Sequence, residues 1–156
     1  IIIKKKVLNK LIYDVNLGAE LFKLIDKKIK YIEIENKKIN INSKIIERNF
    51  RAFLNKNNVN INYLQEKKYI KGIIKEEIRV QLAWKKLIQQ LYGWKINVNI
   101  YEIKNKEKKI NKSLNKKKQN EIKNKIFLSE KSRKFESFSN QHLAKVRKKT
   151  FIKINE

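Results

Sequence analysis

The sequence predicts a mainly α-helical fold with one long amphipathic helix and minor β structure. The chain contains three glycines and no proline, so long stretches lack helix breakers and few tight turns of an all-β fold can form. Apolar residues also recur at helical spacing in several windows. The length of 156 residues suits one domain, and hydrophobic residues, at 41%, are sufficient for a core.

The N-terminal part predicts a helix followed by an alternating segment. Residues 1–3 resemble the tail of a strand, and residues 4–30 predict one helix, or two separated near Gly18. Residues 31–42 alternate around a candidate turn at residues 35–38, which fits either a short hairpin or a loop that opens the next helix. Ser43 is the expected N-cap of a helix that ends near Lys56. Its expected inward residues are Ile46, Phe50, Phe53 and Leu54.

Residues 63–92 carry the strongest helical pattern. One apolar row has four-residue spacing, and a second row runs beside it with spacings of four, three and four. The first row is Ile70, Ile74, Ile78 and Leu82, and the second is Val80, Trp84, Leu87 and Leu91. We therefore predict a wide apolar stripe with Trp84 in the core. Gly93 is expected to adopt a left-handed conformation and end this helix. Asn99, with Glu102 three residues later, is expected to cap the next one.

For the C-terminal part of the chain, the sequence predicts less regular secondary structure. A polar helix is expected from Asn99 to about Lys118, with residues 104–118 forming a basic tract that is solvated or frayed. Residues 122–128 predict a strand, residues 131–140 a loop and residues 141–149 a short helix. We accordingly expect a helical domain over residues 1–130. Residues 131–156, a loop and short helix, are a candidate for the start of a missing or degenerate domain.

The formal net charge of +25 has two competing explanations. Such a charge favours a polyanionic partner such as RNA, DNA or an anionic membrane. However, only five of the 40 basic residues are arginine, and arginine is the better phosphate ligand. Lysine, asparagine and isoleucine are all encoded by AT-rich codons, so codon bias also explains the charge. The sequence leaves both explanations open.

Few residues suit catalysis or metal binding. The chain has no cysteine, which excludes disulfides, thiolate catalysis and cysteine-based zinc sites. His142 is the only histidine, so we predict no metal site and read this residue as a surface or helix histidine. Glu76 and Glu77 are adjacent and predict helix-surface charges. The glycines are isolated, so there is no phosphate-binding loop, and no serine lies in a nucleophile elbow. We predict neither an enzyme nor a cofactor.

The aromatic residues near the end of the long helix allow two interpretations. Aromatic side chains among lysines suit base stacking with a single-stranded nucleic acid. Trp84 lies on the apolar stripe, which favours core packing. Trp94 follows Gly93 and is expected either to pack on the helix end or to contact a ligand. No run reaches the roughly 18 apolar residues of a membrane span. No signal peptide is visible, and because the chain starts with Ile1 we expect a processed or trimmed N-terminus.

The run QLAWKKLIQQLYGWKINVNIYEI, residues 81–103, carries a family resemblance. It resembles the last long helix of the N-terminal chaperone domain of SurA-like proteins, which are periplasmic folding factors for outer-membrane proteins. In that family a Gln-x-Ala-Trp-x-x-Leu-x-x-x-x-Tyr-Gly pattern precedes an Ile/Val-Asn-Val step and a new helix. Residues 4–14 look like the family's opening helix. Residues 120–129 look like the strand that leads into its isomerase region, and the isomerase domain itself is not recognisable.

The resemblance implies an ATP-independent periplasmic chaperone, or holdase, that binds unfolded outer-membrane protein segments on apolar patches. We expect client contacts near the helix end, and structural roles for Trp84 and Gly93. The expected client-binding residues are Ile88, Leu91, Tyr92 and Trp94. Lysines are expected to add weak contacts with anionic lipid or RNA. The alternative is a basic nucleic-acid-binding protein, such as an organellar ribosomal protein from an AT-rich genome, acting in an organellar or cytoplasmic ribosome.

Overall fold

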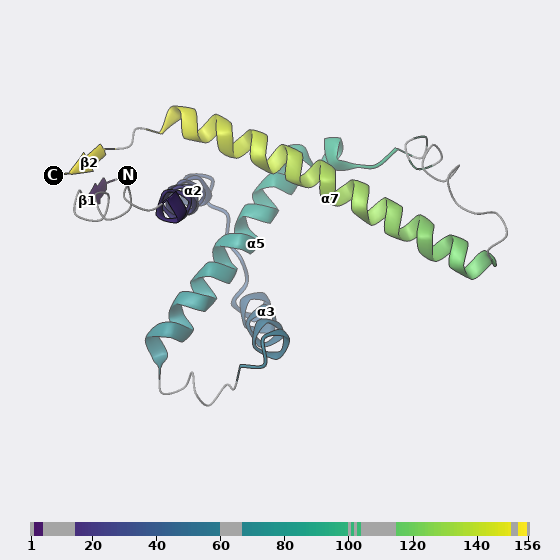
Figure 1. Cartoon of the computed structure of the whole chain (residues 1–156), viewed down its shortest axis with the longest axis horizontal. Helices are drawn as coiled ribbons and strands as arrows, with labels where there is room; N and C mark the ends of the chain where they lie inside the picture. Colours follow the sequence, from purple (N-terminus) through teal and green to yellow (C-terminus); the bar gives the residue numbers. More distant parts are fainter. Residues whose placement is uncertain are drawn as a thin grey trace. The chain divides into compact units, whose positions relative to one another are not determined.

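The structure is a computed structural model that describes residues 2–4, 15–59, 67–99, 101, 103, 115–150 and 153–155, with side chains from residue 21 to residue 150. Its main elements are helices (Figure 1), so the predicted mainly α class is confirmed. In chain order they are β1 (Ile2–Lys4), α2 (Val15–Asn36), α3 (Ser43–Lys56), α5 (Lys68–Ile96), α7 (Lys116–Lys149) and β2 (Lys153–Asn155). The two short strands pair in parallel, with Ile3 opposite Ile154.

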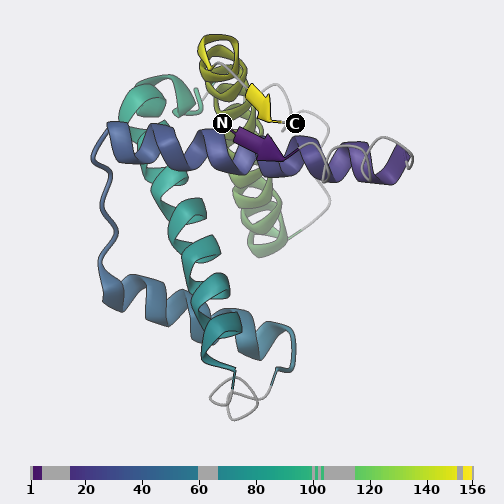
Figure 2. The ribbon, with the colours of Figure 1, turned by 90° about the vertical axis from the view of Figure 1, so that its left-hand side faces the viewer.

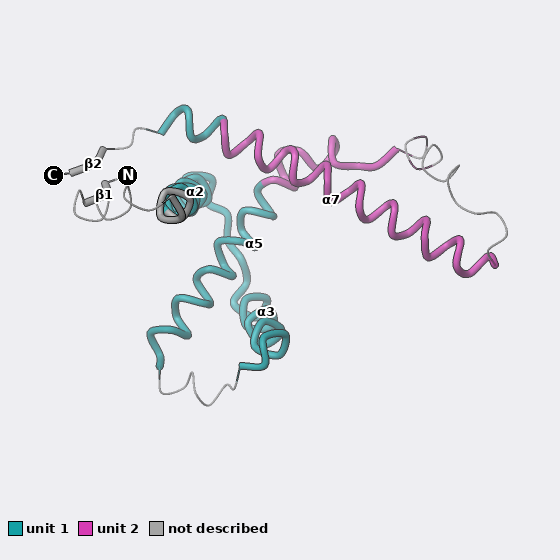
Figure 3. The backbone as a smooth tube through the Cα atoms, in the orientation of Figure 1, with its two compact units in different colours: residues 1–87, 145–156 teal, residues 88–144 magenta. Residues whose placement is uncertain are grey.

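The chain divides into two compact units (Figure 3). The first unit comprises residues 1–87 and 145–156, and the second comprises residues 88–144. Helices α5 and α7 each supply residues to both units. Within the described residues, no helix has both the length and the apolarity needed to cross a membrane.

In the first unit, α3 crosses α5 near its start and α2 crosses it further along, so the two crossings lie at separate levels (Figure 2). The α3 level contains a buried pair, Phe50 and Leu54, packed against Val59, Ile74 and Ile78. The other buried apolar residues of this unit lie on α2 and α5: Ile25, Ile29, Ile34, Val80, Ala83, Trp84 and Leu87. Trp84 is only 5% exposed, so its predicted place in the core is confirmed.

The segment between α2 and α3 corrects the hairpin interpretation. Residues 31–36 continue α2, and a turn follows in which Lys38 has a φ of 51°. Ile34 is fully buried, and this tertiary packing outweighs the local alternation that favours a strand. Residues 39–42 form the connector that the loop alternative predicted. Asn42, not Ser43, caps α3, because its side-chain oxygen accepts a hydrogen bond from the backbone N–H of Lys44 at 2.8 Å.

Helix α5 does not end at Gly93. It continues to Ile96, and no glycine in the described part of the chain has a positive φ. Ile96 is buried, and burying an isoleucine is worth about 1.5–3 kcal/mol. That gain exceeds the roughly 1 kcal/mol cost of glycine inside a helix, which explains the additional turn. The predicted cap at Asn99 is observed, because its Oδ1 accepts from the backbone N–H of Tyr101 at 3.0 Å. Glu102 lies outside the described residues.

The C-terminal prediction was wrong for the strand at 122–128 and the loop at 131–140, whereas the helix predicted at 141–149 is confirmed as the end of a longer helix. Helix α7 continues from Lys116 to Lys149, through the predicted strand at 122–128 and the predicted loop at 131–140. This whole span contains no glycine and no proline, so nothing in the backbone interrupts the helix. Its apolar positions are sparse, which hid the helical period. Residues 104–114 of the basic tract, residues 63–66 before α5 and residues 5–14 before α2 lie outside the described residues, and Gly18 lies within α2.

Candidate functional site

An open groove of about 360 Å³ lies between α3 and α5 in the first unit. Each helix contributes residues at positions i, i+3, i+4 and i+7, which is the spacing of one continuous helix face. The lining residues are Asn49, Ala52, Phe53 and Lys56 on α3, and Ile78, Gln81, Leu82 and Lys85 on α5. The Phe53 side chain is 40% exposed, so an aromatic surface remains accessible in the groove. A cleft of this size is within the roughly 300–1,000 Å³ typical of ligand sites.

The two helices that form the groove, α3 and α5, are packed against each other. Ile78 lines it and also packs against the buried pair Phe50 and Leu54. Lys75 of α5 forms an ion pair with Glu47 of α3, and its ammonium group lies 5.1 Å from the centre of the Phe50 ring. The hydrogen bond from Lys75 is the largest cause that lowers the pKa of Glu47 below its usual value of 4.5. The two helices are therefore joined by apolar packing and by a charged contact.

The charged residues that line the groove are both basic. Lys56 and Lys85 contribute positive charge, and none of the described residues that line the groove is acidic. Nearby carboxylates have basic partners. Besides Lys75, Glu47 has Arg51 at 3.8 Å between Oε1 and Nε. The groove therefore combines an apolar surface with a positive potential.

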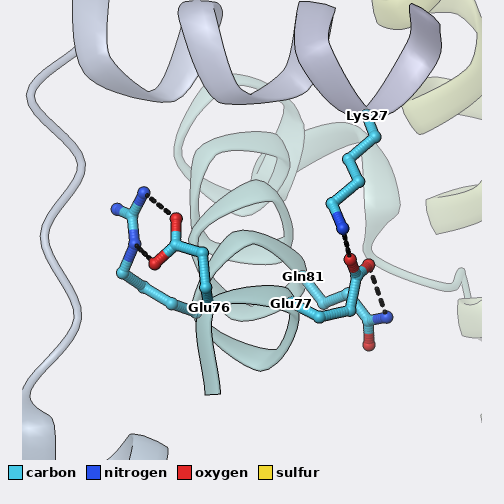
Figure 4. A network of polar contacts seen from close by, with 5 residues as sticks. Lys27, Glu76, Glu77 and Gln81 are labelled. Atoms are coloured by element: carbon cyan, nitrogen blue, oxygen red, sulfur yellow. Dashed lines mark hydrogen bonds and ion pairs between the residues drawn. The ribbon is translucent and has the colours of Figure 1, made fainter. Parts of the chain in front are cut away.

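A second hollow, of about 210 Å³, lies between α2 and α5 in the same unit. Its lining residues are Lys27, Lys30, Glu77, Val80, Gln81 and Trp84, so Gln81 lines both hollows. The Lys30 ammonium lies 5.6 Å from the centre of the Trp84 ring. The carboxylate of Glu77 forms an ion pair with Lys27 and accepts a hydrogen bond from Gln81 at 3.2 Å (Figure 4).

The pKa of Glu77 reflects opposing effects. Partial burial acts to raise it, but the hydrogen bonds from Lys27 and Gln81 and the charges of Lys27 and Lys30 lower it below 4.5. This carboxylate therefore stays charged and offsets one of the two lysine charges that line the second hollow. Sequence reasoning read Glu77 as a surface charge, because its partner lies on another helix and no local spacing indicates it.

Glu76 projects from the opposite side of α5 (Figure 4). It accepts two hydrogen bonds from Arg79, at 2.9 and 2.8 Å. Nη1 of Arg79 also lies 3.3 Å from Oε1 of Glu35 on α2, and its guanidinium carbon lies 5.4 Å from the centre of the Tyr31 ring. These contacts join α2 to α5, so Glu76 belongs to a structural cluster.

In the second unit, the predicted client-binding residues divide into buried and exposed ones. Ile88 is fully buried, so its expected role on a binding surface is corrected to a core role. Leu91 is 39% exposed and Trp94 is 74% exposed. Their i, i+3 spacing places them on one side of α5. The Lys95 ammonium lies 4.7 Å from the centre of the Trp94 ring.

Tyr92 is half-buried and packs within the second unit. Its ring stacks on Phe138, with centroids 5.3 Å apart and an interplanar angle of 12°. Its hydroxyl lies 3.0 Å from Nδ1 of His142. His142 was predicted as a surface or helix histidine, and it lies on α7 with its side chain buried. Among the described residues, no three histidine, aspartate or glutamate side chains are grouped so that they could hold a metal ion.

Comparison with known proteins identifies no relative. The chain matches no family model, no curated protein and no solved structure. The resemblance of residues 81–103 to the SurA-like pattern stays a prediction from the sequence.

Proposed function

We propose that this chain is an ATP-independent holdase that transiently covers apolar segments of unfolded proteins. The observation that best supports this proposal is the α3–α5 groove, an accessible apolar surface on a packed two-helix frame. An exposed apolar patch of this kind is typical of protein-binding surfaces. The chemistry requires no cofactor, since binding rests on removing apolar side chains of the client from water.

The strength of such binding suits a holdase. Burial of one client side chain against Phe53 and Leu82 is worth about 1.5–3 kcal/mol. A Kd of 1 mM already corresponds to about −4.1 kcal/mol, and ordering the client adds a cost. One groove therefore binds weakly and releases quickly. Useful retention requires a second contact on the same client, because linked contacts raise the effective concentration.

Leu91 and Trp94 supply a candidate for this second contact. Both are exposed, and a tryptophan offers a large apolar area at a small entropic cost. The Tyr92 ring stacks on Phe138 and its hydroxyl contacts His142, so we assign Tyr92 a structural role.

The SurA-like pattern at residues 81–103 supports unfolded outer-membrane proteins as clients and the periplasm as the compartment. We propose no isomerase activity, because the sequence carries no recognisable isomerase domain.

The test measures how the chain suppresses aggregation of an unfolded β-barrel protein. Phe53→Gln and Ala52→Gln alter the groove without removing a buried residue. Tyr69→Gln is the matched control, because Tyr69 is 80% exposed and does not line the groove. We expect both groove variants to lose protection while Tyr69→Gln retains it, with the same melting temperature in all three. Equal protection by all variants would contradict the assignment.

Nucleic-acid binding is the second candidate, and the net charge of +25 favours it. A protein that makes 6–10 phosphate contacts loses about 10³–10⁵ in affinity between 50 and 200 mM salt. Capture of apolar segments changes little over this range. RNA binding and client protection should therefore be measured side by side at both salt concentrations. Tight, strongly salt-dependent RNA binding without client protection would favour the ribosomal alternative, whose place would be an organellar or cytoplasmic ribosome.

A further inference from the structure

We infer that the α3–α5 groove selects client segments in which an apolar residue is flanked by carboxylates. This inference rests on the proposed function and specifies which segments bind. It starts from the lining of the groove, which combines the apolar side chains of Phe53, Ile78 and Leu82 with the charges of Lys56 and Lys85. An apolar side chain of the client fits between the helices, and the client residues beside it meet the two ammonium groups.

The carboxylates near the groove do not compensate these lysines. Glu47 pairs with Lys75, and Glu77 pairs with Lys27. Within the part of the chain that the structure describes, Lys56 and Lys85 make no ion pair with any carboxylate. They therefore remain available to an acidic partner.

Lysine is well suited to this arrangement. Its four-carbon stem can lie along apolar surface while the ammonium group stays in water. We therefore expect the stems of Lys56 and Lys85 to extend the apolar surface and their charges to lie at its edge. A client carboxylate next to the apolar anchor is attracted by the two ammonium groups. A basic client residue at the same place is repelled by them. The groove therefore excludes basic apolar segments, including segments of this lysine-rich chain.

The experiment uses the full chain and three fluorescent peptides that share one phenylalanine anchor. The residues on either side of the anchor are glutamate, glutamine or lysine. Fluorescence anisotropy gives the Kd for each peptide at 50 mM salt. Because exposed ion pairs are weak, two of them predict that the glutamate peptide binds about fivefold more tightly than the glutamine peptide. The lysine peptide is expected to bind most weakly.

Two double variants with equal net charge locate the preference. Lys56→Gln with Lys85→Gln removes the charges of the groove. Lys116→Gln with Lys117→Gln removes two charges from exposed positions at the start of α7, outside the groove. We expect the first variant to bind all three peptides with similar affinity and the second to keep the wild-type order. If both variants keep the wild-type order, or if the wild type shows no preference, the inference is wrong.

Ala52→Gln separates failure of this inference from failure of the proposed function. Ala52 lines the groove, so a longer side chain there blocks entry of the anchor. If the glutamine peptide binds the wild type but not Ala52→Gln, the groove is the client site, and the charge preference is judged separately. If Ala52→Gln binds this peptide as well as the wild type, or if no peptide binds the wild type, both the groove assignment and the inference fail.

Discussion

The hydroxyl of Tyr92 lies 3.0 Å from Nδ1 of His142, and the two residues come from α5 and α7. The Tyr92 ring also meets the imidazole ring edge-on, with centroids 5.7 Å apart. Tyr92 was expected to bind clients, and His142 was expected to be a surface or helix histidine. Their contact joins α5 to α7 within the second unit, and we predict that it stabilises this unit.

Removing this hydroxyl should destabilise the protein. Tyr92→Phe keeps the stacking on Phe138 but leaves a buried imidazole nitrogen without its partner, which costs about 1–3 kcal/mol. Urea unfolding measures the change. His142→Phe and the double variant complete a cycle that isolates the contact. Additive effects of the two substitutions would show that the hydrogen bond contributes nothing.

Trp84→Ala should lower the free energy of unfolding by about 3–5 kcal/mol, as for other buried aromatic residues. Trp84 is almost fully buried, and Lys30 lies against its ring. Thermal and urea unfolding measure the loss. Trp94→Ala is the matched control, because Trp94 is largely exposed, and it should change stability by no more than about 0.5 kcal/mol. Similar losses for the two tryptophans would contradict the assigned helix face.

Gly93→Ala should stabilise the protein by about 0.5–1 kcal/mol, because alanine is the better residue inside a helix. A Cβ atom at this position would meet no atom within 4 Å, and the φ angle is not positive. Gly72→Ala, which has the same surroundings, should act similarly at the other end of α5. Destabilisation by Gly93→Ala alone would indicate the left-handed helix end that the sequence suggested.

The Lys27–Glu77 pair predicts a specific pH dependence. Because the pKa of Glu77 is lowered in the folded chain, its contribution to stability is present above about pH 4.5 and is lost as the pH falls through the folded pKa. Glu77→Gln should therefore lower stability at pH 7 and weaken its decline on acidification. Denaturation midpoints from pH 3 to pH 7 test this, with Glu121→Gln as an exposed control. If the stability of Glu77→Gln declines on acidification as steeply as that of the wild type, the pairing is contradicted.

The sequence predicted the parts of the fold that depend on local periodicity. The long amphipathic helix, the buried Trp84 and the inward Phe50 and Leu54 all follow from apolar residues at helical spacing. It failed where distant packing decides the outcome. Burial of Ile96 carries α5 past Gly93, and no local pattern indicates that burial. In α7, too few apolar residues mark the helix, so absence of helix breakers was the better signal.

The groove itself was beyond sequence reasoning. The apolar rows of residues 70–82 and 80–91 looked like one wide stripe, but they serve two packing faces. Ile74 and Ile78 meet the α3 cluster, while Val80 and Trp84 line the hollow beside α2. Phe53 was expected to point inward, yet it remains partly exposed at the groove. The side chains that line a space between two helices depend on how the helices cross. The residue pattern of one helix does not specify that crossing.

Photo-crosslinking tests the central claim, capture of unfolded clients in the α3–α5 groove, most directly. A photoreactive phenylalanine analogue replaces Phe53 in one protein and Tyr69 in another, so both carry the same probe at an exposed aromatic position. With an unfolded β-barrel protein, we predict strong crosslinks from position 53, weak ones from position 69, and loss of the former when Ala52→Gln is added. Equal crosslinking from both positions, or crosslinks at position 53 that persist with Ala52→Gln, would contradict the account.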